Sequence, residues 1–167
     1  MRSFRKIFIL LFLFYSCKVE KNTNSKEEWV SLFNGKDLNG WNIKIANHSL
    51  NDNFNNTFQV QDSMIRVVYT EYDDFDDKYG HMYYKTPYSY YKLRFDYRFI
   101  EEQTSGGENW NVRNSGVMIH SQSAKSNAFE QHFPVSLEIQ LLGGLNKGER
   151  TTANLCTPGT AVYFNGK

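Results

Sequence analysis

Two stretches of sequence decide the fold: NWNVRNSGVMIH at residues 109–120 and PVSLEIQLLGG at residues 134–144. Both runs are short, rich in β-forming residues and alternate in character, which is typical of strands in a sheet. A polar loop separates them, as expected between two neighbouring strands. We therefore predict two strands, each with one aliphatic face and one face that carries polar side chains.

The polar faces of these two strands carry groups that can do chemistry. In a strand, side chains two positions apart share a face, so Glu138 and Gln140 lie together, while Leu137 and Ile139 take the opposite face. His120 ends the first run. A carboxylate, an imidazole and an amide can therefore meet on one sheet surface, with the aliphatic residues buried on the other. We interpret that surface as the functional site.

The rest of the chain also reads as strands. Candidates recur about every ten residues with Gly, Asn or Pro between them, and no amphipathic helical pattern follows residue 17. The most regular alternation, at residues 91–99, predicts a half-exposed strand of an antiparallel sheet. The class is all-β and sandwich-like. The other candidates are the runs at residues 29–33, 58–68 and 79–84.

Length and charge limit the classes of function. The chain has 167 residues and 16% aromatic residues, enough to fill the core of one domain. Its formal net charge is only +1, and no long run of Lys and Arg is present. Nucleic-acid binding requires clustered positive charge, so nucleic acid is not an expected partner.

The amino terminus predicts a targeting segment. Residues 1–17 begin with basic side chains and continue as an apolar run too short to span a bilayer. The run closes at Cys17 and resembles a bacterial lipoprotein signal, in which the Cys is lipidated. A plain secretory signal or an uncleaved anchor is the alternative. We expect a polar tether at residues 18–28, a domain at residues 29–167, and a lipid-anchored protein of the outer membrane or periplasm.

Four motifs stand in an order that resembles the 3-keto-disaccharide hydrolase family. They are WVSLFNGKDLNGW at residues 29–41, RNSG at residues 113–116, SLEIQ at residues 136–140 and RTTAN at residues 150–154. The resemblance implies a concanavalin A-like, glucanase-like antiparallel β-sandwich. It also implies an enzyme that breaks down 3-keto-glycosides by lyase and hydratase steps in the bacterial envelope, with net hydrolysis.

The end of the sequence departs from that resemblance. Members of the family usually continue with further strands, whereas this sequence stops at residues 165–167, an Asn-Gly-Lys turn that follows a strand-like run at residues 161–164. We therefore expect the sandwich to lack its C-terminal strands.

The chemistry of a 3-keto sugar matches the polar residues. The ketone acidifies the hydrogen on C2, and the glycosidic oxygen on C1 lies β to the ketone, so elimination needs a base, an acid and support for an enolate oxygen. His120 and Glu138 are the candidate base and acid. Arg113 and Asn114 are the candidates for holding the enolate oxygen, although both could instead brace the loop.

Further residues are candidates for binding the substrate. Gln140 would orient sugar hydroxyls, Trp110 would stack on a sugar face, and His132 would lie on a loop over the site, with His81 as a secondary candidate. Each also has a structural reading, such as core packing or a surface position. A set of His and Glu could hold a divalent metal as a Lewis acid, but the spacing matches no defined ligand motif, so the metal is left unknown. No organic cofactor is expected.

Two other functions compete with this reading. A non-catalytic carbohydrate-binding module would use the same fold and the same aromatic residues. A conventional glycoside hydrolase would need two carboxylates that flank the bond, and the strand offers Glu138 and Gln140 where a second acid would stand. We rank keto-sugar cleavage first, sugar binding second and conventional hydrolysis third.

Overall fold

The computed structural model describes residues 28–100, 102–163 and 165. The chain divides into two compact units, Met1–Val30 and Ser31–Lys167, and the fold below is that of the second. The predicted signal with Cys17 and nearly all of the predicted tether lie outside the described residues. No helix within the described part of the chain is long and apolar enough to cross a membrane.

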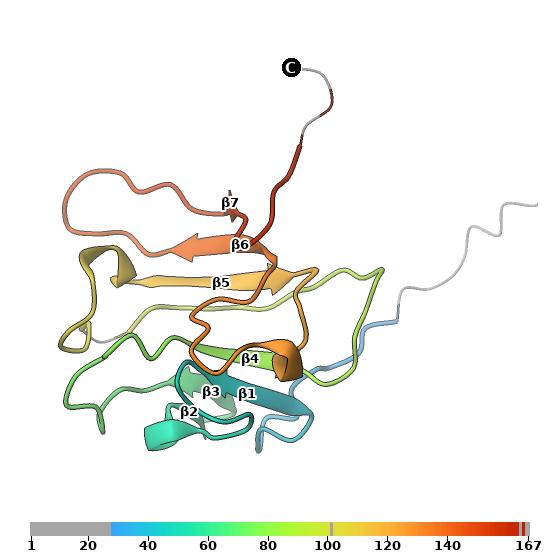
Figure 1. The fold of residues 1–167 in the computed structure, drawn as a ribbon, viewed down its shortest axis with the longest axis horizontal. Helices are drawn as coiled ribbons and strands as arrows, with labels where there is room; N and C mark the ends of the chain where they lie inside the picture. The colour runs from blue at the N-terminus through green and yellow to red at the C-terminus, as the bar shows by residue number, and fades with distance from the viewer. Residues whose placement is uncertain (1–27, 101, 164, 166–167) are drawn as a thin grey trace, which may run out of the picture. The chain divides into compact units, whose positions relative to one another are not determined.

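The described residues form three small antiparallel sheets and no α-helix, so the all-β prediction is confirmed (Figure 1). One sheet pairs β1 with β4, one pairs β2 with β3, and the third has the order β5-β6-β7. The strands are β1 (Trp41–Ile45), β2 (Phe58–Gln61), β3 (Met64–Val67), β4 (Gly80–Tyr84), β5 (Asn114–Ile119), β6 (Leu137–Leu142) and β7 (Asn154–Cys156), with 3₁₀ turns η1 (Phe54–Asn56), η2 (Asn109–Asn111) and η3 (Ala124–Ser126).

The β2–β3 hairpin follows directly from its turn residues. Asp62 and Ser63 connect the strands with positive φ angles of 51° and 57°. Positive φ at both central positions matches the right-handed twist of the flanking strands, and Asp tolerates this conformation better than most residues. The two strands predicted around this turn, at residues 58–68, are therefore confirmed.

The core lies where β1 meets β2 and β4. Ile43, Ile45 and Phe58 are buried and pack together. Gly80, the first residue of β4, packs closely against this cluster. A Cβ there would lie 3.2 Å from the Phe58 ring and 3.3 Å from Ile45. Burial of such side chains supplies the main stabilisation of a domain of this size. Partly buried neighbours complete the cluster: Leu38, Phe54 and Met82.

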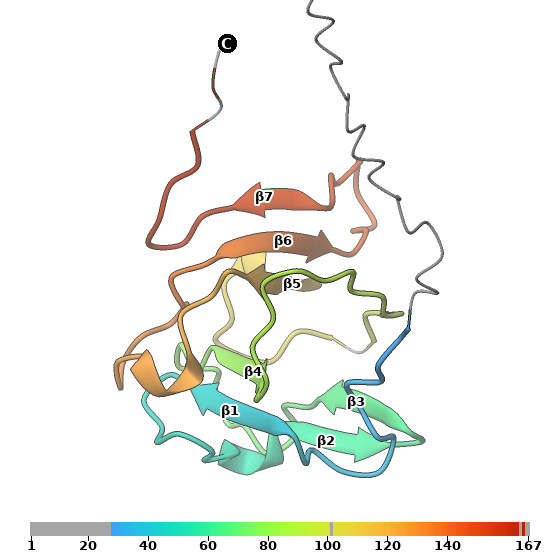
Figure 2. The same ribbon diagram turned by 90° about the vertical axis from the view of Figure 1, so that its right-hand side faces the viewer.

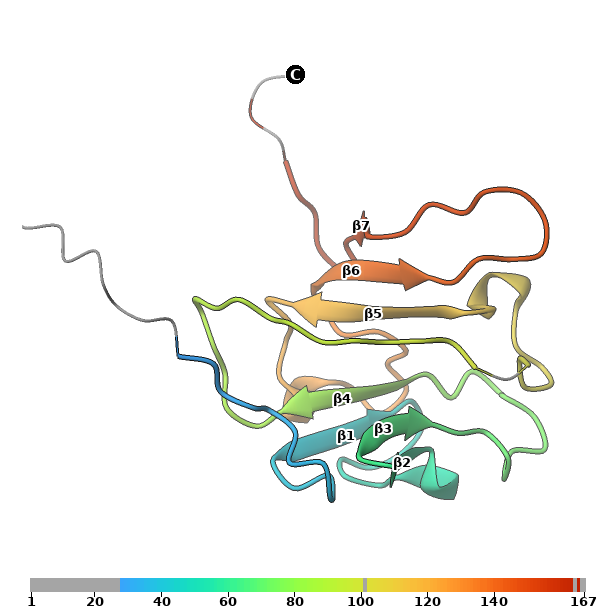
Figure 3. The same cartoon turned by 180° about the vertical axis from the view of Figure 1, so that it is seen from behind.

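The predicted strand at residues 91–99 is wrong. The structure has no strand at these residues, Figure 3 draws the connection from β4 towards β5 without an arrow, and most of its side chains are exposed. Phe99 lies close to Gly143, the residue after β6, since a Cβ on Gly143 would lie 2.6 Å from its ring. Alternation of apolar and polar residues predicts an extended chain with two unlike faces. It does not show whether a second strand lies beside that chain to form ladder hydrogen bonds.

The predicted strand at residues 29–33 is also wrong. No strand is present there, and the chain reaches β1 through the Asn39-Gly40 turn, with φ of 91° at Gly40. Trp41 begins β1, and its indole Nε1 donates a hydrogen bond to the Leu32 carbonyl at 3.1 Å. The segment is therefore held by one side chain and not by a ladder.

The β5-β6-β7 sheet carries the predicted polar surface, and Figure 2 shows its three strands side by side. Ladder pairing sets Gly116 opposite Gln140 and Met118 opposite Glu138, while β7 sets Cys156 on the other side of Glu138. The two central strands are thus where the sequence predicts them. All six residues of β6 are only partly buried, so the aliphatic face is less covered than the sequence suggested.

Candidate functional site

A row of amide side chains crosses the three strands. Asn154 Nδ2 donates to Gln140 Oε1 at 3.2 Å, and Gln140 Nε2 donates to Asn114 Oδ1 at 3.3 Å. Asn114 Nδ2 in turn donates to the Trp110 carbonyl at 3.0 Å. Each amide in the row is therefore oriented by its neighbour, and two predicted site residues, Asn114 and Gln140, are brought together.

Glu138 lies on the same face, two residues before Gln140, and is only partly buried. Its carboxyl has no hydrogen-bond or ion-pair partner among the described residues. Burial raises the pKa of its carboxyl above the ordinary value, because desolvation disfavours the charged form. Glu138 is thus a carboxyl that keeps its proton to higher pH than an exposed one.

Cys156 on the neighbouring strand β7 is the ladder partner of Glu138. Burial raises the pKa of this thiol, and the negative charge of Glu138 raises it further. Such a charge effect requires proximity, as expected for residues that face each other across the β6–β7 ladder. The sequence reasoning did not single out Cys156 as a neighbour of the site.

His120 does not join Glu138 as the alternation suggested. The β5–β6 ladder ends at Ile119 opposite Leu137, and His120 follows with a positive φ of 49° and an exposed side chain. No hydrogen bond links the two side chains among those that the structure describes. The change in backbone conformation removes His120 from the strand, so its face cannot be read from strand periodicity.

Arg113 immediately precedes β5, with a positive φ of 46° and an exposed side chain. Its Nη1 donates to the Gly144 carbonyl at 2.7 Å. Its own carbonyl accepts from the Gly143 N–H at 2.8 Å, which continues the β5–β6 pairing by one residue. Arg113 thus braces the end of the strand pair, which is the structural role that the sequence left open.

Arg150 is a second guanidinium at this end of the sheet. Its Nη1 donates to the carbonyls of Val112 and Gly143 at 2.6 and 3.1 Å, and its Nη2 donates to the Trp110 carbonyl at 3.4 Å. It therefore holds the loop that carries Trp110. The sequence reasoning did not choose Arg150, although it opens the RTTAN motif at residues 150–154 that carried the resemblance.

An aromatic cluster stands before β5. Trp110 is 50% exposed, and its ring stacks on Tyr79 with centroids 5.8 Å apart and planes 9° apart. Tyr79 also contacts the rings of His132 at 5.2 Å and Phe133 at 4.7 Å. Two predicted substrate-binding residues, Trp110 and His132, therefore share one neighbour.

His81 supports this cluster from β4. Its Nε2 lies 2.7 Å from the His132 carbonyl, which fixes the backbone of the loop. Burial lowers the pKa of His81, and the nearby charge of Lys44 lowers it too, against the opposing effect of the hydrogen bond. A neutral ring that donates to a carbonyl indicates a structural role.

A family model, that of the 3-keto-alpha-glucoside-1,2-lyase-like domain, matches residues 28–165. That span contains every described site residue. The chain belongs to the 3-keto-alpha-glucoside-1,2-lyase-like family. No curated protein and no solved structure matches it significantly. The resemblance drawn from the four sequence motifs is therefore confirmed at the level of the family, which is named for an activity on 3-keto-glucosides.

The described part of this lyase-like domain contains no group of three or more His, Cys, Asp and Glu side chains placed to hold a metal ion. Glu138 has a single ionisable neighbour across the ladder, Cys156, and His120 is exposed beyond the strand. These residues do not form a donor set for a divalent ion, so we derive no chemical step through a metal.

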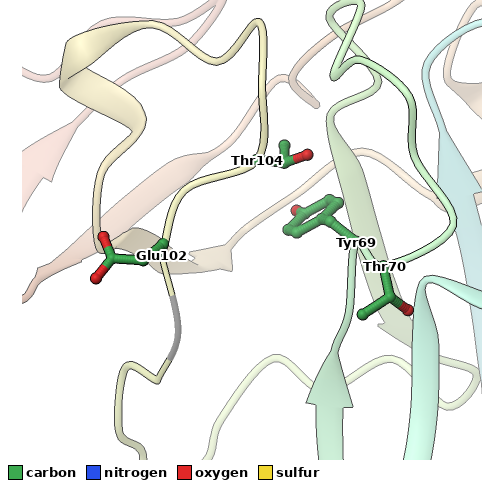
Figure 4. Close-up of a pocket in the computed structure, with 4 residues that line it drawn as sticks. All are labelled: Tyr69, Thr70, Glu102 and Thr104. Atoms are coloured by element: carbon green, nitrogen blue, oxygen red, sulfur yellow. The ribbon is translucent and has the colours of Figure 1, made fainter.

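A small cavity of about 170 Å³ lies elsewhere in the lyase-like domain (Figure 4). Its lining residues are Tyr69, Thr70, Glu102 and Thr104, none of which the sequence predicted for the site. Burial raises the pKa of Tyr69 to about 12, so this phenol stays protonated. One carboxyl, one phenol and two hydroxyls thus line this cavity.

Proposed function

We propose that this protein cleaves 3-keto-glycosides by elimination, with Glu138 as the general acid. The observation that carries the proposal is a partly buried carboxyl with a raised pKa and no partner among the described residues, beside an oriented row of amides. A carboxyl whose pKa is raised by burial is a candidate for a catalytic group. The membership of a family named for 3-keto-glucoside lyase activity supports the substrate class.

The proposed reaction begins at C2 of the keto sugar. A base removes the C2 proton, and the electron pair forms an enolate with the adjacent ketone. The C1–O bond then breaks, a C1=C2 double bond forms, and the departing oxygen takes a proton from Glu138. Water added to the resulting unsaturated sugar completes a net hydrolysis. General acid catalysis of such a step is typically worth about 10²- to 10⁴-fold.

Glu138 suits the acid role better than the base role. A general acid must carry its proton near the working pH, and burial favours the protonated form of this carboxyl. A carboxylic acid that donates to no protein acceptor keeps its O–H free for the leaving oxygen. Bound sugar would exclude more water from the carboxyl and hold the proton more firmly.

The amide row and the aromatic stack would bind the sugar. Asn114, Gln140 and Asn154 each retain donor or acceptor capacity beyond the row, because a primary amide offers two N–H groups and two lone pairs. The half-exposed Trp110 ring, supported by Tyr79, offers a flat apolar face for a pyranose ring. His132 would line the same side from its loop.

His120 and Arg113 complete the proposal at the end of β5. His120 is exposed beyond the strand and would act as the base on C2 once substrate lies over the sheet. Arg113 uses one nitrogen on Gly144, and a guanidinium has five N–H donors, so others remain for the enolate oxygen together with Asn114. Both assignments require bound substrate to connect them with Glu138.

The experiment compares a 3-keto-disaccharide with its non-oxidised parent, using mass spectrometry to identify products. We expect cleavage of the keto sugar only, with the unsaturated sugar or its hydrate as product. Glu138→Gln should lower kcat by about 10²- to 10⁴-fold while sugar affinity stays within a few-fold, since Gln keeps the volume but donates no proton. Cleavage of the parent sugar would instead indicate conventional glycoside hydrolysis.

The alternative is a carbohydrate-binding module, and the exposed Trp110–Tyr79 stack favours it. A module would bind the sugar without turnover. Trp110→Ala would then weaken binding, whereas Glu138→Gln would change nothing. Wild-type turnover and its loss in Glu138→Gln separate the two functions, because Trp110→Ala would weaken sugar binding in both.

Two further proposals concern the architecture and the location. The family resemblance supports a concanavalin A-like sandwich, to which the three antiparallel sheets would contribute. The N-terminal sequence supports a lipid anchor at Cys17 and a place in the bacterial envelope. Detergent-phase partitioning tests the anchor: Cys17→Ala should release the protein, and unchanged partitioning would reject lipidation.

A further inference from the structure

The polar side chains of the β6 strand and the residue before it lean in one direction across the sheet. Gln140 stands opposite Gly116 in the ladder, but its amide donates to Asn114, two residues earlier. Ser136, just before β6, donates from Oγ to the sulfur of Met118 at 3.1 Å. Both side chains thus reach diagonally across the sheet, towards the N-terminal end of β5.

Glu138 follows the same diagonal and reaches the one position in β5 that has no side chain. It stands opposite Met118 in the ladder, yet its side chain lies over Gly116. A Cβ added to Gly116 would lie 2.2 Å from Glu138 Oε1, 2.7 Å from its Cγ and 2.9 Å from its Cδ. The carboxyl thus fills the space that the missing side chain leaves.

The backbone gives no other reason for this glycine. Gly116 is in the middle of β5 and is not among the glycines with positive φ. Without such a need, glycine inside a strand is less favourable than alanine, because its backbone loses more conformational freedom on folding. A glycine that packs a side chain over its Cα is the usual alternative explanation.

The polar residues beside Glu138 are engaged with one another. Met118 is engaged by Ser136 on one side, and Asn114, Gln140 and Asn154 are joined to one another on the other. The carboxyl lies over Gly116, where no side chain stands. The same arrangement keeps the carboxyl away from donors that would lower its proton affinity.

We propose that Gly116 is a positioning residue, whose absent side chain seats the Glu138 carboxyl against the sheet in a desolvated and unpaired state. This inference rests on the proposed function only where it concerns catalysis. The seat itself is a property of the folded chain and can be measured without substrate.

Gly116→Ala would remove the seat. The new Cβ would displace the carboxyl towards solvent, and the carboxyl would then titrate closer to an ordinary glutamic acid. A misplacement of about 1 Å in a catalytic group can lower a rate by about 100-fold. We therefore expect kcat to fall about 10- to 100-fold, with little change in KM.

The direct test is the titration of the Glu138 carboxyl by ¹³C NMR in the full chain. The resonance is assigned by its loss in Glu138→Gln. We expect its midpoint to move to lower pH in Gly116→Ala. Gly144→Ala is the matched control, because a Cβ there meets nothing within 4 Å, and it should leave the titration of Glu138 unchanged.

A double-mutant cycle keeps the proposal testable if Gly116→Ala folds poorly. The destabilisation by Gly116→Ala should largely disappear in a Glu138→Ala background, where the collision is absent. An unchanged titration together with no coupling in the cycle would overturn the inference. A wild type without turnover would reject the proposed function alone, since both measurements are made without substrate.

Discussion

Lys44 in the β1–β4 sheet and Glu138 in the β5-β6-β7 sheet are both ionisable side chains inside a strand, but their surroundings differ. Lys44 is only 4% exposed, and its Nζ donates to three backbone carbonyls, those of Ile45, His48 and Phe129, at 2.9, 2.9 and 3.0 Å. Glu138 is less buried, and its carboxyl has no hydrogen-bond partner among the described residues.

The difference separates a structural group from a functional one. A buried ammonium with all three donors engaged holds the loop at Phe129 against β1, and its value lies in the contacts that it makes. A partly buried carboxyl that accepts no hydrogen bond from the protein lowers the stability of the fold. Such groups are retained at sites where their reactivity is used. The predictions below test this contrast.

Lys44→Met should have the largest effect on stability. Methionine keeps the apolar stem but donates no hydrogen bond, which leaves buried carbonyls with fewer donors. We expect the free energy of unfolding to fall by about 2–3 kcal/mol. Urea denaturation measures it, with the exposed Lys85→Met as control. A loss no larger than that of the control would remove the structural role of Lys44.

His81 should make stability depend on pH. Burial lowers its pKa in the folded state, so the unfolded chain binds the proton more readily. The stability is fully present above the unfolded pKa of about 6.5 and is lost as pH falls below it, by at most about 1.4 kcal/mol per pH unit. His81→Gln should flatten that dependence in denaturation curves between pH 7 and 5.

The matched control for His81 is His120→Gln, which changes an exposed imidazole. If His81→Gln retained the full loss of stability on acidification, the buried ring would not be its source.

Glu138→Gln should have the smallest effect on stability, with the opposite pH dependence. Because the folded pKa of Glu138 is raised, its protonated form favours the fold, and the penalty for ionisation appears as pH rises through that pKa. The variant should therefore be slightly more stable at pH 7, by less than about 1 kcal/mol for a partly exposed group. Below about pH 4 the difference should vanish. A destabilised variant at pH 7 would show that Glu138 makes favourable contacts.

The sequence predicted the all-β class and the two strands that carry the candidate site residues. Strand alternation placed Glu138 and Gln140 on one face correctly, because both residues lie within a paired strand. It failed at His120, whose positive φ angle ends the alternation. It also failed at residues 91–99, where extended chain has no ladder. The Asn154–Gln140–Asn114 row depends on the register between strands, which no single strand encodes.

The measurement that tests the central claim most directly compares the titration of Glu138 with the pH dependence of catalysis. With Glu138 as the general acid, kcat/KM for a 3-keto-glycoside should decline on the alkaline side with the midpoint that ¹³C NMR gives for Glu138 in the free protein. The decline in kcat should lie at higher pH, because bound sugar desolvates the carboxyl further. An alkaline limb unrelated to that titration, or wild-type turnover retained by Glu138→Gln, would contradict the account.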